Sequence, residues 1–252
     1  MNKKLLLKII ITIVIIALII ILLPFVFPRK YAVLTYHDFT TGKPENSMQK
    51  NIDDFKKEMK YLKKHNYKTL TLSDVECYMN KKCKLPRKSV LITFDDGWKS
   101  EYELALPILK EYGFNAVIFY IGDNIDGDNT NFMSKDELFE IKNNYPNIEI
   151  ASHTFNNHKD DAYTKTVDEL NQDFKNMKNI VDTKYFAYPY GLYSESYIKA
   201  LKKNKYSLAF TFGGDAKHKK FNNNDNRYLI PRLNLSTDYP YWKFVLRMYL
   251  PF

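Results

Sequence analysis

The stretch Ser89-Val-Leu-Ile-Thr-Phe-Asp-Asp-Gly97 decides the fold of this chain. Its first six residues carry no charge, which is typical of a parallel strand buried on both faces. Asp95 and Asp96 follow directly, and Gly97 allows the chain to turn. In α/β proteins, ligands gather at the carboxyl ends of such strands. Asp and Gly also occur in plain turns and helix starts, so this pair alone does not establish a site.

Strands and amphipathic helices alternate on both sides of this stretch. Short apolar runs predict seven strands, at 31–36, 67–72, 89–94, 116–121, 148–151, 185–188 and 207–211. Apolar residues at helical spacing predict helices near 52–62, 102–112, 167–181 and 194–203, and a capping box opens another at Ser134. The alternation predicts an α/β domain with about seven parallel strands, which suits a barrel better than two small domains.

The N-terminus predicts one transmembrane helix before this domain. No charge interrupts the 19 residues from Ile9 to Phe27, and Lys3, Lys4 and Lys8 precede them. We therefore expect a cytoplasmic stub and membrane anchor at 1–30 and an extracytoplasmic domain at 31–252, held at the cell membrane. A cleaved signal peptide and a secreted domain are the alternative.

The charge distribution argues against nucleic acid as a partner. The formal net charge is +9, but residues 1–30 hold five basic and no acidic side chains. The other 222 residues therefore carry a net charge of only +4, spread along the chain. Two cysteines, Cys77 and Cys83, exclude a disulfide-built scaffold, and either a disulfide or two free thiols fits their spacing.

A second polar segment, Ser152-His-Thr-Phe-Asn-Asn-His158, also follows a predicted strand. Its two histidines are separated by five positions, so they do not share one helix face, but an irregular loop can turn both inward. One carboxylate and two histidines form a three-ligand set that leaves positions open on a catalytic metal. The second carboxylate is then free to act as a base. Two solvated loop histidines are the alternative.

These segments resemble motifs of the polysaccharide deacetylases, carbohydrate esterase family 4. The likeness rests on Thr93-Phe-Asp-Asp-Gly97, on the histidine segment, and on Phe186-Ala-Tyr-Pro-Tyr-Gly191. The histidine spacing of five, the absence of an Arg before Pro-Tyr, and an early Leu34-Thr-Tyr-His37 resemble the subgroup that acts on the poly-β-1,6-N-acetylglucosamine of biofilm matrices. The resemblance implies a distorted (β/α) barrel.

The resemblance also implies roles for individual residues. Asp95 is expected to be the general base, Asp96, His153 and His158 the metal ligands, and a protonated His37 the general acid. The ligand set accepts a divalent metal ion, with Zn as the first expectation and Co or Ni as alternatives.

Four further residues are candidates for the site. Arg232, in Ile230-Pro-Arg-Leu233, is the candidate to hydrogen-bond Asp95 and keep it ionised, with an ordinary surface Arg as the alternative. Tyr190, Tyr188 and Trp98 are candidates for a sugar-stacking wall, with core packing as the alternative for most of the tyrosines.

The expected function is metal-dependent hydrolysis of N-acetyl groups from a GlcNAc polymer, most simply poly-β-1,6-N-acetylglucosamine. A peptidoglycan or chitin-type deacetylase is the alternative within the same enzyme class. A non-catalytic surface polysaccharide-binding protein is the alternative from another class. Expected partners are the polysaccharide, the membrane and the machinery of polysaccharide synthesis and export.

Overall fold

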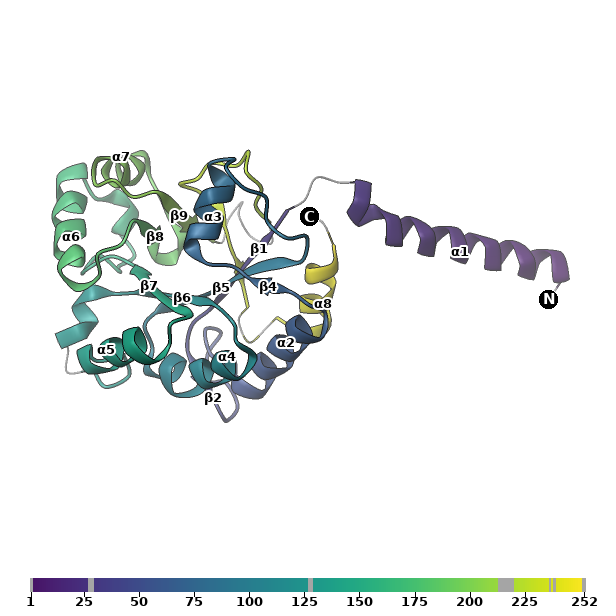
Figure 1. Ribbon diagram of the computed structural model, residues 1–252, viewed down its shortest axis with the longest axis horizontal. Helices are drawn as coiled ribbons and strands as arrows, with labels where there is room; N and C mark the ends of the chain where they lie inside the picture. The colour runs from purple at the N-terminus through teal and green to yellow at the C-terminus, as the bar shows by residue number, and fades with distance from the viewer. Residues whose placement is uncertain are drawn as a thin grey trace.

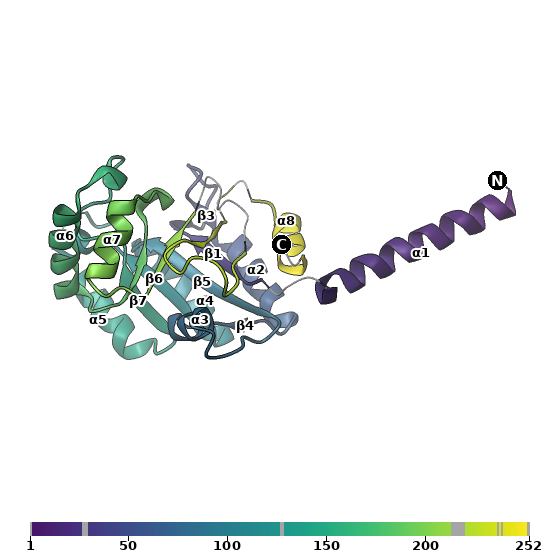
Figure 2. The same ribbon diagram turned by 90° about the horizontal axis from the view of Figure 1, so that it is seen from above.

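The computed structural model describes residues 2–26, 30–126, 129–212, 220–235, 237 and 239–250. A helix, α1 (Lys3–Val26), precedes an α/β domain in which helices surround a curved sheet (Figures 1 and 2). The strands of the main sheet are β1 (Ala32–Tyr36), β4 (Lys68–Thr69), β5 (Ser89–Asp96), β6 (Ala116–Tyr120), β7 (Ile148–Ser152), β8 (Tyr185–Ala187), β9 (Leu208–Thr211), β10 (Ile230–Pro231) and β11 (Leu233–Asn234).

The α-helices of the domain are α2 (Ile52–Lys64), α3 (Leu72–Met79), α4 (Leu106–Tyr112), α5 (Lys135–Asn144), α6 (Val167–Ile180), α7 (Glu195–Lys203) and α8 (Tyr241–Tyr249). A π-helical turn, η1 (Glu101–Ala105), leads into α4. Three 3₁₀ turns are η2 (Gly122–Asp126), η3 (Ala162–Thr164) and η4 (Pro189–Gly191). A small separate sheet pairs β2 (Phe39–Thr40) with β3 (Lys50–Asn51).

All pairings in the main sheet are parallel, and the strand order is β10-β9-β8-β7-β6-β5-β1-β11, with β4 also paired to β5. The described residues thus place eight strands in one continuous order, so the expected count of about seven is wrong. All seven predicted strands form: six lie in this order, and the seventh, β4, pairs beside it with β5. The two strands of the main sheet that were missed, β10 and β11, have two residues each, which is too short for hydrophobic periodicity to reveal.

Those two short strands nearly close the sheet into a barrel. Ile230–Pro231 pairs with β9 at one end of the order, and Leu233–Asn234 pairs with β1 at the other. The single residue between them, Arg232, lies at this seam, where its backbone N–H donates to the Thr211 carbonyl at 2.9 Å. A distorted barrel of parallel strands is therefore the observed architecture.

The strands bury both of their faces. On β5, Val90, Ile92 and Phe94 pack in the cluster formed with the surrounding helices, while Leu91 points into a second cluster. That inner cluster includes side chains of β1, β6, β7 and β9, and α3 packs against it. Burial on both faces explains the continuous apolar run from which the strand was predicted.

The predicted transmembrane helix is not supported. A helix that crosses a membrane needs about 20 predominantly apolar residues. Although α1 forms in the predicted segment, no helix in the described part of the chain combines the length and apolar character of a membrane span.

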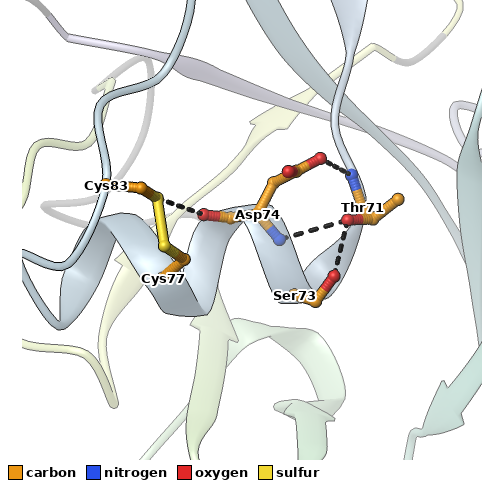
Figure 3. Close-up of a disulfide and its surroundings, with 5 residues drawn as sticks. All are labelled: Thr71, Ser73, Asp74, Cys77 and Cys83. Atoms are coloured by element: carbon orange, nitrogen blue, oxygen red, sulfur yellow. Dashed lines mark hydrogen bonds between the residues drawn. A yellow bond between two sulfur atoms is a disulfide. The ribbon is translucent and has the colours of Figure 1, made fainter.

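Cys77 and Cys83 form a disulfide (Figure 3). It joins the last turn of α3 to the segment after it, and the Cys83 sulfur also lies 4.0 Å from the Asp74 carbonyl oxygen. At the other end of α3, Thr71 caps the helix, because its hydroxyl accepts from the Asp74 N–H at 3.1 Å. The sequence left open either a disulfide or two free thiols, and the structure has the disulfide.

Candidate active site

Asp95 and Asp96 lie at the end of β5, where the backbone turns sharply. Asp96 and Gly97 have φ values of 77° and 82°, which are in the left-handed region. A Cβ on Gly97 would approach the Tyr120 ring to 2.2 Å, so this position requires glycine. The turn sends the two carboxylates in different directions, as expected for adjacent residues at a strand end.

Asp95 forms a buried ion pair with Arg232. The guanidinium donates two hydrogen bonds, from Nη1 to Oδ1 at 2.6 Å and from Nη2 to Oδ2 at 2.7 Å. Both side chains are fully buried, which excludes the alternative of an ordinary surface Arg. Burial alone would raise the pKa of Asp95, but Arg232 and the nearby histidines hold it below its usual value. The predicted contact of Arg232 with Asp95 is therefore present, and it keeps the carboxylate ionised.

Asp96, His153 and His158 converge on one point. Their ligand atoms all lie within 4.8 Å of one another. Asp96 Oδ1 lies 3.5 Å from His153 Nε2 and 3.2 Å from His158 Nε2, although it is buried and has no hydrogen-bond partner among the described residues. An orphaned carboxylate oxygen facing two imidazole nitrogens is an arrangement that a divalent cation would satisfy. The residues present therefore fit the metal that the sequence predicts.

The electrostatics of Asp96 agree with this fit. Burial raises the pKa of its carboxyl group, but the three neighbouring histidines outweigh burial and hold that pKa far below its usual value. Its second oxygen, Oδ2, accepts a hydrogen bond from the Trp98 indole at 3.1 Å. Asp96 is thus an ionised carboxylate with one oxygen fixed by Trp98 and the other directed at the histidines.

His153 is held in the orientation that a ligand requires. Its Nδ1 lies 2.8 Å from the Ala187 carbonyl oxygen at the end of β8, so Nδ1 carries the hydrogen and Nε2 remains free to bind. Its backbone N–H donates to the Tyr120 carbonyl at 2.9 Å. Although burial lowers the pKa of His153, Asp95 and Asp96 raise it above its usual value in the metal-free protein.

The loop between the two histidines is irregular, and this allows side chains five positions apart to face the same Asp96 oxygen. Thr154 has a φ of 74°, and the loop is pinned by Asp173 of α6. The Asp173 carboxylate accepts hydrogen bonds from the backbone N–H groups of Phe155 and Asn156, both at 2.9 Å. His158 is thereby held at the mouth of the site, where burial and His153 lower its pKa to about 4. Sequence reasoning missed Asp173, because one Asp on an amphipathic helix has no distinctive spacing.

His37 follows β1 and lies next to Asp95. Its Nε2 is 3.9 Å from Asp95 Oδ2, so the structure brings the predicted acid to the predicted base. Its side chain is almost fully buried, and this burial lowers the pKa of His37 despite the neighbouring aspartates. Burial thus favours the neutral imidazole in the resting protein, and the role of His37 as the acid stays a prediction.

The three aromatic candidates differ in exposure. Tyr190 is 43% exposed, and its ring centroid lies 4.6 Å from that of His158. Trp98 is half-buried beside Asp96. Tyr188 is fully buried and packs against Phe186 and Tyr197, so it offers no ring face to a sugar and belongs to the core. Of the three candidates, Tyr188 is therefore the one that packs in the core.

Glu101 is a second residue that sequence reasoning missed. It lies in η1, five positions after Asp96, and is fully buried with no hydrogen-bond partner to either carboxylate oxygen among the described residues. Burial, followed by the charges of Asp96 and Asp95, raises the pKa of Glu101 well above its usual value. Burial therefore favours the neutral form of this carboxylic acid beside the two aspartates.

Comparisons with known proteins agree with this geometry. The sequence profile of the family "Polysaccharide deacetylase" matches residues 82–209, which include β5 and the histidine loop. YxkH of Bacillus subtilis (strain 168), provisionally named as a polysaccharide deacetylase, is 31% identical over 190 residues, which are 73% of this chain and 65% of that protein. The chain thus spans slightly less than two thirds of that relative's length.

A named enzyme and a solved structure extend the comparison. The poly-β-1,6-N-acetyl-D-glucosamine N-deacetylase of Staphylococcus aureus (strain MSSA476) is 32% identical over 214 residues, which cover 79% of this chain and 72% of the enzyme. The deacetylase PplD of Streptococcus pyogenes, solved with acetate, superposes with a TM-score of 0.77 at 21% identity, covering 88% of this chain and 99% of that one, and shares the fold. The chain belongs to the polysaccharide deacetylase family and is a hydrolase that acts on amides.

Proposed function

We propose that this protein removes N-acetyl groups from poly-β-1,6-N-acetylglucosamine in a metal-dependent reaction. The observation that carries the metal dependence is the convergence of Asp96, His153 and His158 next to the Asp95–Arg232 pair. The 32% identity with the Staphylococcus aureus enzyme supports the substrate. The histidine spacing and the early His37 support it independently, by resemblance to that subgroup.

Asp96, His153 and His158 would hold the metal ion. A divalent metal bound there supplies Lewis acidity, which polarises the acetamide carbonyl and makes a water molecule acidic enough to attack at neutral pH. Two imidazole nitrogens and one carboxylate oxygen suit Zn, with Co and Ni as alternatives.

Asp95 is placed to accept the proton of the attacking water. Arg232 keeps this carboxylate ionised at neutral pH and fixes its plane through two hydrogen bonds. The water oxygen bonds to the acetyl carbon, and its proton passes to Asp95. Because both Asp95 oxygens are already held by Arg232, the base does not have to be ordered during the reaction.

His37 is placed to return a proton to the leaving nitrogen. It rests neutral, so it first takes up the proton that Asp95 has accepted, across the 3.9 Å between Asp95 Oδ2 and His37 Nε2. Protonation of the nitrogen then allows the C–N bond to break, giving a free amine and acetic acid, which ionises to acetate in solution. One proton thus moves from water to amine through two side chains of this chain.

The test is acetate release by the full chain from β-1,6-linked and β-1,4-linked GlcNAc oligomers. We expect release from the β-1,6 oligomer only, with loss of activity after treatment with a chelator and recovery after Zn is returned. Asp95→Asn should lower the rate by at least about a hundredfold, as expected when a general base is lost. Release from the β-1,4 oligomer only would move the substrate to peptidoglycan or chitin. Full activity in the chelator would contradict the metal dependence.

We further propose that the barrel acts outside the cytoplasm. The Cys77–Cys83 disulfide supports this, because disulfides persist in oxidising compartments and are rare in the cytosol. Labelling of intact cells with a membrane-impermeant amine reagent tests it, with modification of surface lysines as the expected result. Labelling that requires cell lysis would contradict the proposal.

A further inference from the structure

Phe132 lies beside the metal-binding turn although it is far from it in sequence. Its ring packs on that of Trp98, with centroids 4.5 Å apart and planes 36° from parallel. The two residues also form an isolated antiparallel bridge, and both side chains are half-buried. The pair therefore forms one continuous aromatic surface that is partly open to solvent.

The backbone holds Phe132 firmly in this position. The Lys99 N–H donates to the Asn131 carbonyl at 2.7 Å, and the Met133 N–H donates to the Gly97 carbonyl at 2.9 Å. The Met133 carbonyl in turn accepts from the Tyr120 hydroxyl at 2.6 Å. Asn131 and Met133, the neighbours of Phe132, are thus hydrogen-bonded to the segment that carries Asp96. These bonds fix the backbone of Phe132 relative to the site.

The Trp98–Phe132 surface and the exposed ring of Tyr190 both lie next to the ligand group, each at a different residue of it. Asp96 Oδ2 accepts from Trp98, whereas Asp96 Oδ1 faces His158, on which the Tyr190 ring packs. A ligand whose reacting group lies over Asp96 and the histidines would therefore have one aromatic surface next to Asp96 and another next to His158. Ligand sites commonly combine such apolar surfaces with a few polar groups that fix orientation.

We propose that Trp98 and Phe132 form a platform for the sugar next to the one that is deacetylated, which makes Phe132 a substrate-positioning residue. The inference rests on the proposed function, because it concerns the same site. The C–H groups on the face of a pyranose ring are attracted to the electron-rich face of an aromatic ring. An enzyme with two separate aromatic surfaces beside its reacting centre can hold a chain of sugars rather than a single GlcNAc unit.

The protein offers a direct reporter for this contact, because it has only two tryptophans, Trp98 and Trp242. Trp242 is 66% exposed on α8 and takes no part in the site. In a full-length Trp242→Phe background, the emission of Trp98 would therefore report binding at the platform. The chelator-treated protein should be titrated with a β-1,6-linked GlcNAc tetramer, so that binding is measured without turnover.

Addition of Phe132→Ala to this background should weaken tetramer binding about five- to tenfold, which is the size expected for a lost ring–ring contact. Phe132→Tyr keeps the ring and should bind like the parent, which separates stacking from folding. Phe139→Ala is the matched control, because Phe139 is 67% exposed on α5 and takes no part in the site. With metal returned, Phe132→Ala should raise KM for the tetramer while kcat and the rate on monomeric GlcNAc stay the same.

Unchanged tetramer binding by Phe132→Ala would overturn the platform. An equal loss of rate on monomer and tetramer, together with weaker binding by Phe132→Tyr, would also overturn it, because that pattern indicates a role in folding only. Failure of the parent protein to bind or deacetylate any β-1,6 oligomer would instead overturn the proposed substrate. The two failures are therefore distinguishable.

Discussion

Asp95 and Asp96 are neighbours in the chain, but the structure gives them different electrostatic surroundings. Asp95 is paired with a guanidinium, and Asp96 faces two imidazole nitrogens and an indole N–H. A left-handed backbone at Asp96 and Gly97 separates the two side chains. This separation allows one carboxylate to hold a charge for proton transfer while the other serves as a ligand.

Removal of the Arg232 charge should destabilise the protein as well as inactivate it. Arg232→Met leaves Asp95 buried without a partner, and breaking a buried pair in this way costs about 3–5 kcal/mol. Urea unfolding should show this loss. The double variant Arg232→Met with Asp95→Leu removes both charges and should recover much of the stability while remaining inactive. Equal stability of the single variant and the wild type would contradict the prediction.

Metal affinity should fall as the pH falls, because imidazole must be neutral to bind a metal. The aspartates raise the pKa of His153 above 6.5 in the metal-free protein, whereas the pKa of His158 is lowered to about 4. Below pH 6.5, one proton therefore competes with the metal for His153, and affinity should drop about tenfold per pH unit down to about pH 5. Competition with a chromophoric chelator across this range measures the slope, and a flat profile would contradict it.

Glu101→Gln should stabilise the protein at neutral pH. The folded-state pKa of Glu101 is raised well above 4.5, so its contribution to stability is complete at acid pH and is lost as the pH rises above 4.5. Gln resembles the neutral acid and does not titrate. The variant and the wild type should therefore be similar at pH 4, and above pH 4.5 the variant should gain about 1.4 kcal/mol per pH unit until the folded-state pKa of Glu101 is reached. A difference that does not grow with pH would contradict the prediction.

At the scale of elements, each strand of the site ends in the residues that act. Asp95 and Asp96 end β5, His153 follows β7, His37 follows β1, and Ala187, which orients His153, ends β8. Helices contribute from outside the sheet, as α6 does through Asp173. Parallel pairing of these strands brings their carboxyl ends to one edge, and this places residues that are distant in sequence within hydrogen-bond reach.

Asp173→Ala should weaken metal binding without unfolding the barrel. The substitution frees the backbone N–H groups of Phe155 and Asn156, and the loop that carries His158 then loses its attachment to α6. Loss of a group that orients a ligand typically costs 10- to 100-fold in metal affinity. Asp168→Ala, an exposed position at the start of the same helix, is the control and should bind metal normally. Equal affinities for the two variants would contradict the role of Asp173.

The sequence was sufficient to predict the parts of the fold and site that repeat a pattern or match a motif. The long apolar run at β5 and the helical stripes have strong periodicity, and the Asp-Asp and His segments directly follow strands. It was not sufficient for β10 and β11, for Asp173, or for Phe132, because each depends on a single tertiary contact that leaves no spacing in the chain. The lowered pKa of His37 likewise follows from burial, which only the folded structure reveals.

At the scale of the whole molecule, two segments hold the barrel together. The Cys77–Cys83 disulfide ties down the end of α3, which packs against the inner cluster of the barrel. The 230–234 segment joins the two ends of the strand order. Residues at the mouth of the barrel are therefore positioned by contacts that extend through the entire sheet.

Reduction of the disulfide should lower stability while leaving the geometry of the site intact, because α3 packs away from the ligand residues. The paired Cys77→Ser and Cys83→Ser variant should lose about 2 kcal/mol in urea unfolding, as expected for a short closed loop. Its kcat for acetate release at 25 °C should match that of the wild type. A large loss of kcat in a folded variant would contradict this separation of stability from activity.

The 230–234 segment, which closes the barrel, links the proposed activity of the enzyme to complete folding of the sheet. The same five residues that join the first and last strands also deliver Arg232 to Asp95, so the two events cannot occur separately. A molecule folded only as far as β9 would have Asp96, His153 and His158 but no Arg232 beside Asp95. On the proposed mechanism, the reaction would therefore begin only after the last part of the sheet has docked.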